Sequence, residues 1–539
     1  MTPENDFDFI VIGSGFGGSV SALRLTEKGY RVAVLEKGLR YEPADFPKTN
    51  WHLRRSVWMP RLGLLGIQAL TLLRHVLVLH GVGVGGGSLV YANQLIEPDK
   101  AILDKLEWGS EDWKERLAPH FLEAKRMLGA VMCPEIGNAD RILQQVGIEL
   151  RGEDTFHINP VGVFFGESGK TVPDPYFNGE GPDRTGCKKC GACMIGCPVG
   201  AKNTLDRNYL YLAEKRGAQI FPATEVIGVR PGTTSGYEVI VQQAHGLLRK
   251  KRVLSSRNVI FSGGVLGTVD LLLRCKSNGM LPNLSDRLGD LTRTNSEAIL
   301  GVDSRDHTTD WNDHIAITSG IYPDSSTHIE VVRYNKGSDL LYAIATILTD
   351  GGGKIPRTLR FLGNILRHPY QFLRALWIPG QSARTSVLLV MQSTENYLHL
   401  HRNAFGLVST LPLDGKRIPT YIPIANEVTR RMAEKMKGYP KGSWFEVLLD
   451  APTTAHILGG CVLGEKPEQG VVDTQGRIFG YPGLYVVDGS VIPVNLNANP
   501  ALTITAVAEY FMSHIPEKES FSSTPAVVNA RSLASSASD

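Results

Sequence analysis

The segment FIVIGSGFGGSVSALRL, residues 9–25, constrains the fold more than any other part of the chain. Residues 7–13 have the apolar pattern of a buried strand, residues 13–28 that of a helix, and residues 30–36 that of a second strand. A strand, a helix and a strand in this order predict a βαβ unit and therefore an α/β fold.

Three glycines at the first turn indicate what this unit binds. Gly13 permits a tight turn, Gly15 lets the backbone approach a pyrophosphate at the helix N-terminus, and Gly18 allows close packing of helix on strand. Glu36 ends the second strand, where a carboxylate can accept hydrogen bonds from a ribose 2′-hydroxyl. The motif predicts a dinucleotide site and leaves NAD and FAD both open.

Two further glycine-rich segments follow, GVGVGGGSLVYANQ at 81–94 and NVIFSGGVLGTVDLL at 258–272. Small residues at these places let the backbone approach a flat ring or a phosphate closely. Each segment alone is weak support, because glycine-rich strand ends are common in α/β proteins.

Length and charge set the limits of the remaining function classes. The chain has 539 residues, of which 42% are hydrophobic and 21% charged, and this predicts more than one globular domain. Its formal net charge of +3 gives no support for binding nucleic acid. The opening residues MTPENDFDFIVIGSG lack the pattern of a secretion signal, so we expect a cytoplasmic protein.

Five strings, in this order along the chain, carry a resemblance to a known family: GVGVGGGSLV, KNTLDRNYLYLAEKRGA, LPNLSDRLGD, HILGGC and NPALTITAVAE. The chain resembles the glucose-methanol-choline (GMC) flavoprotein oxidoreductases over residues 7–511, and within them the cholesterol oxidase-like branch. The resemblance implies FAD and oxidation of an alcohol by hydride transfer to the flavin, with a hydrophobic, sterol-like alcohol as substrate. It also implies a Rossmann-like FAD-binding domain interleaved with an α+β substrate-binding domain, as in p-hydroxybenzoate hydroxylase.

On this pattern we assign the chain to two discontinuous domains and a tail. The predicted FAD-binding domain comprises residues 1–100, 181–300 and 451–515, the substrate-binding domain 101–180 and 301–450, and the Ser- and Ala-rich tail 516–539 is expected to be disordered.

The resemblance also implies individual site residues. His456 in HILGGC and Asn499 in NANP match the family's active-site histidine and asparagine, types suited to sharing the proton of a substrate hydroxyl. The FAD-contacting positions, besides Gly13, Gly15, Gly18 and Glu36, are expected at Gly86, Gly87, Asn93, Val226, Asp488 and Gly489. No histidine stands where some members bind FAD covalently, so noncovalent FAD is expected, although His80 lies just before the glycine segment.

Steroid-type members use a glutamate to move a double bond after oxidation. The string IEVVRYNKGSDLL resembles that region and puts Asp339 at the corresponding place. Aspartate is one methylene shorter, and proton transfer needs close approach, so isomerisation is doubtful and a solvated turn is the alternative role for Asp339.

The string GCKKCGACMIGCP at 186–198, here called the cysteine loop, contains four of the seven cysteines. The spacing C-x2-C-x2-C-x3-C-P of Cys187, Cys190, Cys193 and Cys197 is that of bacterial iron–sulfur ligation. A zinc site and a metal-free loop are the alternatives, because four thiolates also suit tetrahedral zinc. In ferredoxins with two clusters the fourth cysteine of such a run binds the other cluster, and this chain has no second run.

Two segments rich in Arg and in apolar residues, 51–79 and 354–377, are interpreted either as helices that lie on an anionic membrane or as core-packed helices with a basic outer face. The electron acceptor also stays open. An oxidase would pass the electrons to oxygen, a dehydrogenase would pass them through the cysteine loop to a carrier, and a non-catalytic electron-transfer flavoprotein is a third alternative.

Overall fold

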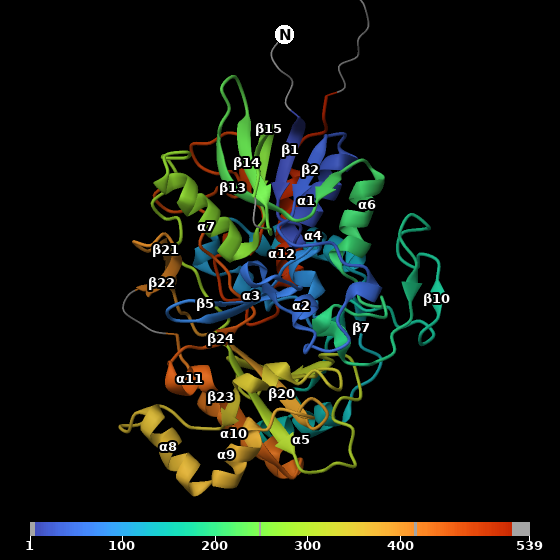
Figure 1. The fold of residues 1–539 in the computed structure, drawn as a ribbon, viewed down its shortest axis with the longest axis vertical. Helices are drawn as coiled ribbons and strands as arrows, with labels where there is room; N and C mark the ends of the chain where they lie inside the picture. Colours follow the sequence, from blue (N-terminus) through green and yellow to red (C-terminus); the bar gives the residue numbers. More distant parts are fainter. Residues whose placement is uncertain (1–5, 247–248, 414–417, 520–539) are drawn as a thin grey trace, which may run out of the picture.

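The computed structural model describes residues 6–246, 249–413 and 418–519. Two seven-stranded sheets form the two ends of the molecule, and a three-stranded sheet lies between them (Figure 1). The fold is the α/β arrangement expected, with a Rossmann-like sheet and a separate antiparallel sheet.

The first sheet is built on the predicted βαβ unit. β1 (Phe7–Ile12) and β2 (Val32–Leu35) are adjacent and parallel, and α1 (Phe16–Glu27) connects them. The other strands are β12 (Gln219–Phe221), β15 (Lys251–Phe261) and β25 (Leu484–Val486), which extend the parallel part, and β14 (Tyr237–Gln243) and β13 (Thr224–Pro231), which are antiparallel. Four helices pack beside this sheet, α4 (Trp113–Met127), α6 (Tyr209–Lys215), α7 (Gly264–Ser277) and α12 (Ala501–Ser513).

The second sheet is antiparallel throughout. Its order is β19 (Ala345–Ile347), β23 (Gly438–Ser443), β16 (Ala298–Ser304), β20 (Thr385–Gln392), β18 (Thr327–Val332), β17 (Ser319–Ile321) and β8 (His157–Ile158). Helices α5 (Asn138–Arg151) and α10 (Pro423–Lys435) cover one face and form a core with it. These two helices do not cover the opposite face of the sheet.

The small sheet joins two segments that matter for the site. β6 (Leu77–Gly81) pairs with β5 (Gln68–Leu72) and in parallel with β24 (Thr453–Thr454). β6 leads into the glycine segment 81–94, and β24 ends two residues before His456. The sheet therefore holds the histidine loop beside the second glycine segment.

The remaining elements are short. They are α2 (Leu53–Ser56), β3 (Trp58–Met59), β4 (Leu64–Leu65), α3 (Lys100–Leu103), β7 (Val131–Met132), β9 (Pro160–Val161), β10 (Thr171–Val172), β11 (Arg184–Thr185), α8 (Arg357–Arg367), α9 (Pro369–Leu376), β21 (Leu398–Arg402), β22 (Val408–Pro412) and α11 (Trp444–Leu448).

The expectation of a helix across residues 51–79 is wrong, whereas that for 354–377 holds as two helices. In the first segment only α2 and a 3₁₀ turn at Pro60–Leu62 are helical. Gly63, which has a φ of 70°, and Gly66, where a Cβ would lie 2.3 Å from the backbone nitrogen of Val57, interrupt the chain before the β5–β6 hairpin. In the second segment Pro369 begins a new helix, so α8 and α9 meet at an angle. No helix in the described ranges is long and apolar enough to span a bilayer.

All strands of the first sheet lie within the predicted FAD-binding segments, while β16 of the second sheet crosses the predicted boundary at residue 300. Of the predicted tail, residues 520–539 lie outside the described residues. Lys518 is described, and it donates from its backbone to the Lys28 carbonyl and from its side chain to Asp8. The division into domains and the disordered tail stay predictions.

Candidate active site

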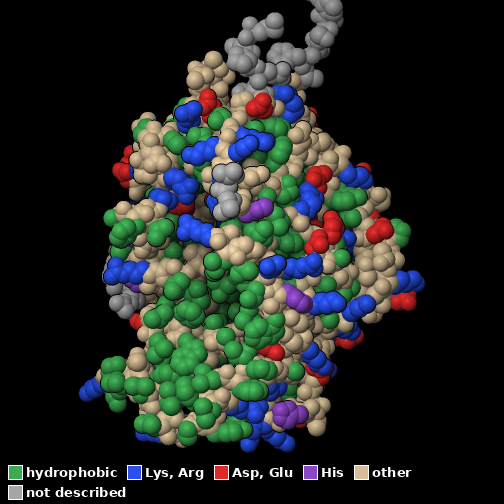
Figure 2. Space-filling model, in the orientation of Figure 1, with side chains coloured by type: hydrophobic (Ala, Val, Ile, Leu, Met, Phe, Trp, Pro, Cys, Tyr) green, Lys and Arg blue, Asp and Glu red, His purple; other side chains and the backbone are tan. Residues whose placement is uncertain are grey.

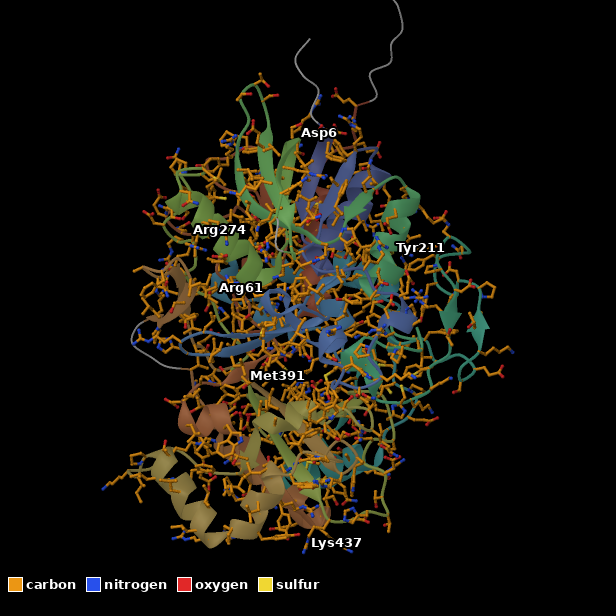
Figure 3. The ribbon with its side chains drawn as sticks, viewed as in Figure 1. Asp6, Arg61, Tyr211, Arg274, Met391 and Lys437 are labelled. Carbon is orange, nitrogen blue, oxygen red and sulfur yellow. The ribbon has the colours of Figure 1, made fainter. Side chains whose placement is uncertain are left out.

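His456 and Asn499 lie where the two large sheets approach each other. Met391, labelled in Figure 3, is buried at the end of β20 that faces this junction. Asn295 donates a hydrogen bond of 2.8 Å to the carbonyl of Ala498, directly before Asn499, and its Nδ2 is 3.7 Å from the Met391 sulfur. The second sheet is thereby fastened to the loop that carries Asn499.

His456 is fixed by a buried carboxylate that sequence reasoning missed. Its Nδ1 is hydrogen-bonded to Oε1 of Glu297, the residue before β16. The other oxygen of Glu297 accepts the backbone N–H of Ala455 at 2.9 Å. Because Glu297 is buried and holds both the ring and the loop, it fixes the ring orientation and leaves Nε2 to face the site.

Asn499 is fixed by a second buried carboxylate. Its Nδ2 donates to Oε2 of Glu330 on β18 at 3.3 Å, and Asn159 donates to the other oxygen at 2.8 Å. The side-chain oxygen of Asn499 is buried and has no hydrogen-bond partner within the described residues. An acceptor or donor atom left in this state in a buried site indicates that a bound molecule completes it.

Burial and neighbouring groups shift the pKa values of Glu330 and His456. Burial raises the pKa of Glu330 to about 7, against the opposing effects of Asn499, His456 and Asn159. Burial lowers the pKa of His456, but the charge and hydrogen bond of Glu297, with Glu330, outweigh it, so this pKa is raised above its usual value. The imidazolium form of His456 is therefore stabilised, and Glu330 can change protonation near neutral pH.

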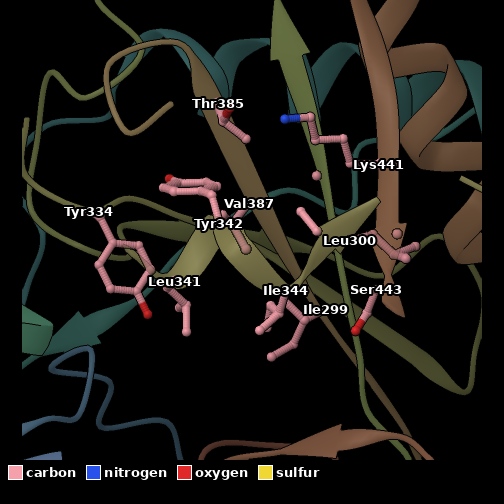
Figure 4. A pocket seen from close by; sticks show the side chains of 13 residues that line it. Ile299, Leu300, Tyr334, Leu341, Tyr342, Ile344, Thr385, Val387, Lys441 and Ser443 are labelled. Carbon is pink, nitrogen blue, oxygen red and sulfur yellow. The ribbon is translucent and has the colours of Figure 1, made fainter. Parts of the chain in front are cut away.

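An apolar cavity lies on the same face of the second sheet as Glu330. Glu330 pairs with Leu389, and Leu389 pairs with Ile299, so these three side chains form one row on that face. The cavity, of about 40 Å³, begins in this row (Figure 4). Its other lining side chains include Tyr334, Leu341, Tyr342, Ile344 and Val387. Ile299 lines the cavity, so the cavity and Glu330 lie on the same face of the sheet, two strands apart.

Asp339 lies apart from the group formed by His456, Asn499 and their two carboxylate partners. Its two carboxylate oxygens accept the backbone N–H groups of Gly380 and Ser382, at 2.9 and 2.7 Å. It precedes the short 3₁₀ helix of residues 340–344, which lines the cavity. Asp339 is buried rather than the solvated turn residue considered as an alternative, and its contacts are those of a loop anchor. Glu330, nine residues earlier, is instead the carboxylate that contacts Asn499.

Gly13, Gly15 and Gly18 lie at the β1–α1 turn as expected. A Cβ at Gly13 would lie 2.3 Å from the Ser262 carbonyl oxygen, and one at Gly18 would lie 2.0 Å from the Gly13 oxygen, so both positions require glycine for packing. A Cβ at Gly15 would meet no protein atom within 4 Å, so the fold leaves room before the N-terminus of α1 for a pyrophosphate.

Glu36 contacts both glycine motifs. Its carboxylate accepts the Ser14 hydroxyl at 2.7 Å and the backbone N–H groups of Ser14, Gly38 and Gly83. Glu36 therefore holds the two loops together, and a bond from it to a ribose stays a prediction.

The other predicted FAD positions lie around the same turn. A Cβ at Gly86 would lie 2.7 Å from Cα of Gly15, so the two glycine motifs touch, and Gly87 follows at the start of a 3₁₀ turn. Asn93 has a φ of 69°, is fully buried, and both polar atoms of its side chain are without partners within the described residues. These features fit a flat, polar cofactor edge at Asn93.

Asp488, Gly489 and Val226 lie farther along the first sheet. Asp488 follows β25 and accepts from Ser490 and, at 2.5 Å, from the Thr268 hydroxyl at the start of α7. Gly489 accepts the backbone N–H of Gly459, which links this strand end to the histidine loop. Val226 lies at an irregularity in β13. Contact of these three with FAD stays a prediction.

The four cysteines of the cysteine loop line one small cavity, together with Lys202. Cys193 and Cys197 are buried, and Cys190 is exposed. In the part of the chain that the structure describes, no three His, Cys, Asp or Glu side chains are arranged to hold a single metal ion. Burial raises the pKa of Cys187 to about 12 and that of Cys193 to about 11, so these thiols are protonated near neutral pH without a metal.

Comparison with family models agrees with this geometry. Residues 7–288 match the N-terminal and residues 419–508 the C-terminal model of the GMC oxidoreductases. The chain is a GMC oxidoreductase. As such it is an FAD-dependent enzyme that acts on CH–OH donors.

Two relatives and one solved structure show which GMC oxidoreductases this chain resembles. It is 47% identical to a cholesterol oxidase of Mycobacterium tuberculosis, over 95% of this chain and 92% of that one. It is 46% identical to a cholesterol oxidase of Acinetobacter baumannii, over 96% of each. The crystal structure of pyridoxine 4-oxidase from Mesorbium loti has the same fold, with a TM-score of 0.58 at 13% identity, over 94% of this chain and 98% of that one.

Sequence reasoning missed Glu297, Glu330 and Asn159 in this enzyme. Glu330 carried a readable signal, because it is a lone acid inside the apolar strand THIEVV. Glu297 and Asn159 carried none, since each lies at a strand end among other polar residues.

Proposed function

We propose that this enzyme oxidises the hydroxyl group of a hydrophobic, sterol-like alcohol to the ketone. The observation that carries the proposal is the pairing of His456 with Glu297 and of Asn499 with Glu330. Glu330 shares a face of the second sheet with Ile299, which lines an apolar cavity. Identities of 46–47% to two cholesterol oxidases over almost the full chain support the substrate class.

FAD would be held noncovalently by glycines that leave room for its pyrophosphate and by Asn93, whose side chain has no hydrogen-bond partner within the described residues. The backbone at Gly15 and Gly86 would face the pyrophosphate, and the Asn93 amide would face the flavin edge. His80, the one nearby candidate for a covalent bond, is half-buried and hydrogen-bonded through Nε2 to Thr71 across the β5–β6 pair. Bound FAD supplies the hydride acceptor for the alcohol carbon.

His456 is the proposed acceptor of the hydroxyl proton. Nε2 faces the site, while Glu297 at Nδ1 orients the ring and stabilises the charge that the ring gains with the proton. The Asn499 amide nitrogen donates one N–H to Glu330, and its second N–H would donate to the same substrate oxygen. Two polar groups on one oxygen fix its position while the rest of the alcohol lies in apolar surroundings.

Glu330, rather than Asp339, is the carboxylate placed to move a proton after oxidation. It lies beside Asn499, and its pKa of about 7 allows it to accept and return a proton near neutral pH. Isomerisation of an unsaturated steroid ketone is therefore proposed through Glu330.

Contact with a membrane surface is the proposed route for the substrate. α8 and α9 expose a row of large apolar side chains, and Figure 2 shows these hydrophobic side chains gathered over the lower part of the molecule. The most exposed are Leu359, Leu366, Tyr370, Leu373 and Trp377. Both helices pack against β19, whose residue Ala345 lines the cavity. An apolar substrate would thus pass from the bilayer toward the cavity without crossing bulk water.

The test is peroxide formation and oxygen uptake by the FAD-loaded enzyme with cholesterol and with a long-chain primary alcohol. We expect turnover of cholesterol with one peroxide per ketone. Failure to oxidise any sterol would overturn the substrate class. The cysteine cavity favours a second candidate, a dehydrogenase, which would reduce an artificial one-electron acceptor much faster than it reduces oxygen.

A further inference from the structure

We propose that the four cysteines of the cysteine loop bind one iron–sulfur cluster, with Lys202 as its buried counter-charge. This site is separate from the alcohol site, and alcohol oxidation as proposed above does not require it. The inference rests on the backbone path of the loop, the donors aimed at its sulfurs, and the surroundings of Lys202.

The path of the loop brings the fourth cysteine back to the first three. A 3₁₀ turn, Ala192–Ile195, lies between Gly191 and Gly196, which have φ values of 71° and 109°. Cys197 itself has a φ of 71°, unusual for a residue with a side chain, and its N–H bonds the carbonyl of Ala192 at 3.3 Å. As a result Cys197 lines the same cavity as the other three thiols, so no second run of cysteines is needed.

The arrangement suits a cluster better than a single ion. A zinc ion needs its ligand atoms to converge on one point, and the described residues contain no such group. In a [4Fe–4S] cluster each thiolate binds a different iron, so the four sulfurs surround a volume instead of one point. Four thiols around a shared cavity match the second requirement.

The backbone approaches three of the sulfurs. The N–H of Lys189 donates to Cys187 Sγ at 3.3 Å. The backbone of Ala192 lies beside the sulfur of Cys190, and that of Ala316 lies beside the sulfur of Cys193. Such N–H donors to sulfur stabilise the negative charge that cluster ligands carry, and they give neutral thiols little benefit.

Lys202 supplies a buried charge without a carboxylate partner. Its side chain is almost fully buried, and Nζ donates to the carbonyls of Leu89, Tyr91 and Cys193 at 3.0, 2.9 and 2.7 Å. It makes no ion pair with any acid among the described residues. A buried ammonium group is costly unless an anion is near, and Lys202 lines the same cavity as the four thiols.

The same lysine joins the cysteine loop to the predicted FAD site. Leu89 ends the 3₁₀ turn that contains Gly86 and Gly87, and Tyr91 lies two residues before Asn93. The cluster would therefore lie directly behind the segment assigned to the flavin.

The test uses the full chain, purified without air and with FAD bound. We expect iron and acid-labile sulfide in equal amounts, about four of each per chain for a [4Fe–4S] cluster. In addition to the flavin bands, we expect a broad visible absorption. Dithionite should bleach this broad absorption. Iron, sulfide, zinc and free thiols are measured on the same sample.

Cys190→Ser is the decisive variant, because Cys190 is the exposed member of the four and its replacement leaves the buried packing in place. We expect it to lose most of the iron and sulfide while it keeps its FAD. The matched control is Cys275→Ser, since Cys275 lies in α7 outside the cavity and should keep both. Three results would overturn the proposal: one zinc per chain without sulfide, a metal-free protein in which all seven thiols titrate, or full iron and sulfide in Cys190→Ser.

Discussion

The alcohol site and the cysteine cavity are both buried at the junction of the sheets, but their charges are balanced in different ways. In the alcohol site each key polar group has a partner from the protein, His456 with Glu297 and Asn499 with Glu330. In the cysteine cavity Lys202 donates to three backbone carbonyls and lies over the Tyr91 ring. The first site is therefore organised by the chain itself, whereas in the second the proposed cluster would supply the opposing negative charge.

The largest effect is expected at His456. His456→Ala should lower the rate of flavin reduction by about 10²- to 10⁴-fold, because the hydroxyl proton loses its acceptor. Anaerobic stopped-flow absorbance measures this rate. His52→Ala, in an exposed position, is the control and should react as the wild type does. A rate within twofold of wild type in His456→Ala would remove the histidine from the mechanism.

Loss of the Asn499 amide should rank second. Asn499→Ala removes a donor to the substrate oxygen and also leaves Glu330 with one fewer partner, so we expect kcat to fall by about 10²-fold. Steady-state oxygen uptake measures it. An effect confined to KM would indicate that Asn499 contributes only to ground-state binding.

Glu297→Gln tests whether the pairing organises the histidine. Its carboxylate raises the pKa of His456, and the neutral imidazole is the form that accepts a proton. Removing the charge lowers this pKa, so the acid limb of the kcat/KM profile should move to lower pH. The maximum rate should fall as well. An unchanged acid limb would mean that it reports another group.

Glu330→Gln should affect the second step more than the first. We expect ketone formation within a few-fold of wild type and accumulation of the unconjugated ketone, because the amide cannot take up a proton. Chromatography of the products from cholesterol separates the two ketones. Asp339→Asn is the matched control, because its side chain anchors a loop, and it should give the wild-type product. Wild-type product from Glu330→Gln would contradict the assignment.

The smallest effect concerns the surface. Leu366→Gln on α8, with a side chain 84% exposed, should weaken sedimentation with anionic vesicles several-fold and leave kcat with detergent-solubilised substrate unchanged. Leu106→Gln, 92% exposed but away from α8 and α9, is the control. Equal vesicle binding by both variants would exclude α8 from the contact.

Features formed by residues close together in the sequence could be predicted more readily than features formed by distant residues. The β1–α1–β2 unit could be predicted because its pattern and its glycines lie within 30 residues. The spacing of the four cysteines did not decide whether Cys197 folds back to the other three, and the structure places all four around one cavity. The helix expected at 51–79 failed because the pairing of β6 with β5 and β24 outweighs local apolar character.

Local sequence patterns could not predict the partners of His456 and Asn499. Glu297 lies 159 residues from His456, and Glu330 lies 169 residues from Asn499. Only the register of the second sheet brings these acids to the site. Asp339 was chosen by its distance along a motif, but the turn after β18 directs it to the backbone of Gly380 and Ser382 instead.

The central claim is that the His456–Glu297 pair takes the hydroxyl proton of a sterol-like alcohol as the flavin is reduced. Its most direct test is anaerobic mixing of the FAD-loaded enzyme with cholesterol, followed by flavin absorbance and ketone analysis. The account predicts rapid bleaching with one ketone per flavin in the wild type and bleaching slowed at least 100-fold in His456→Ala. No bleaching of the wild type by any sterol, or equal rates in the two proteins, would contradict it.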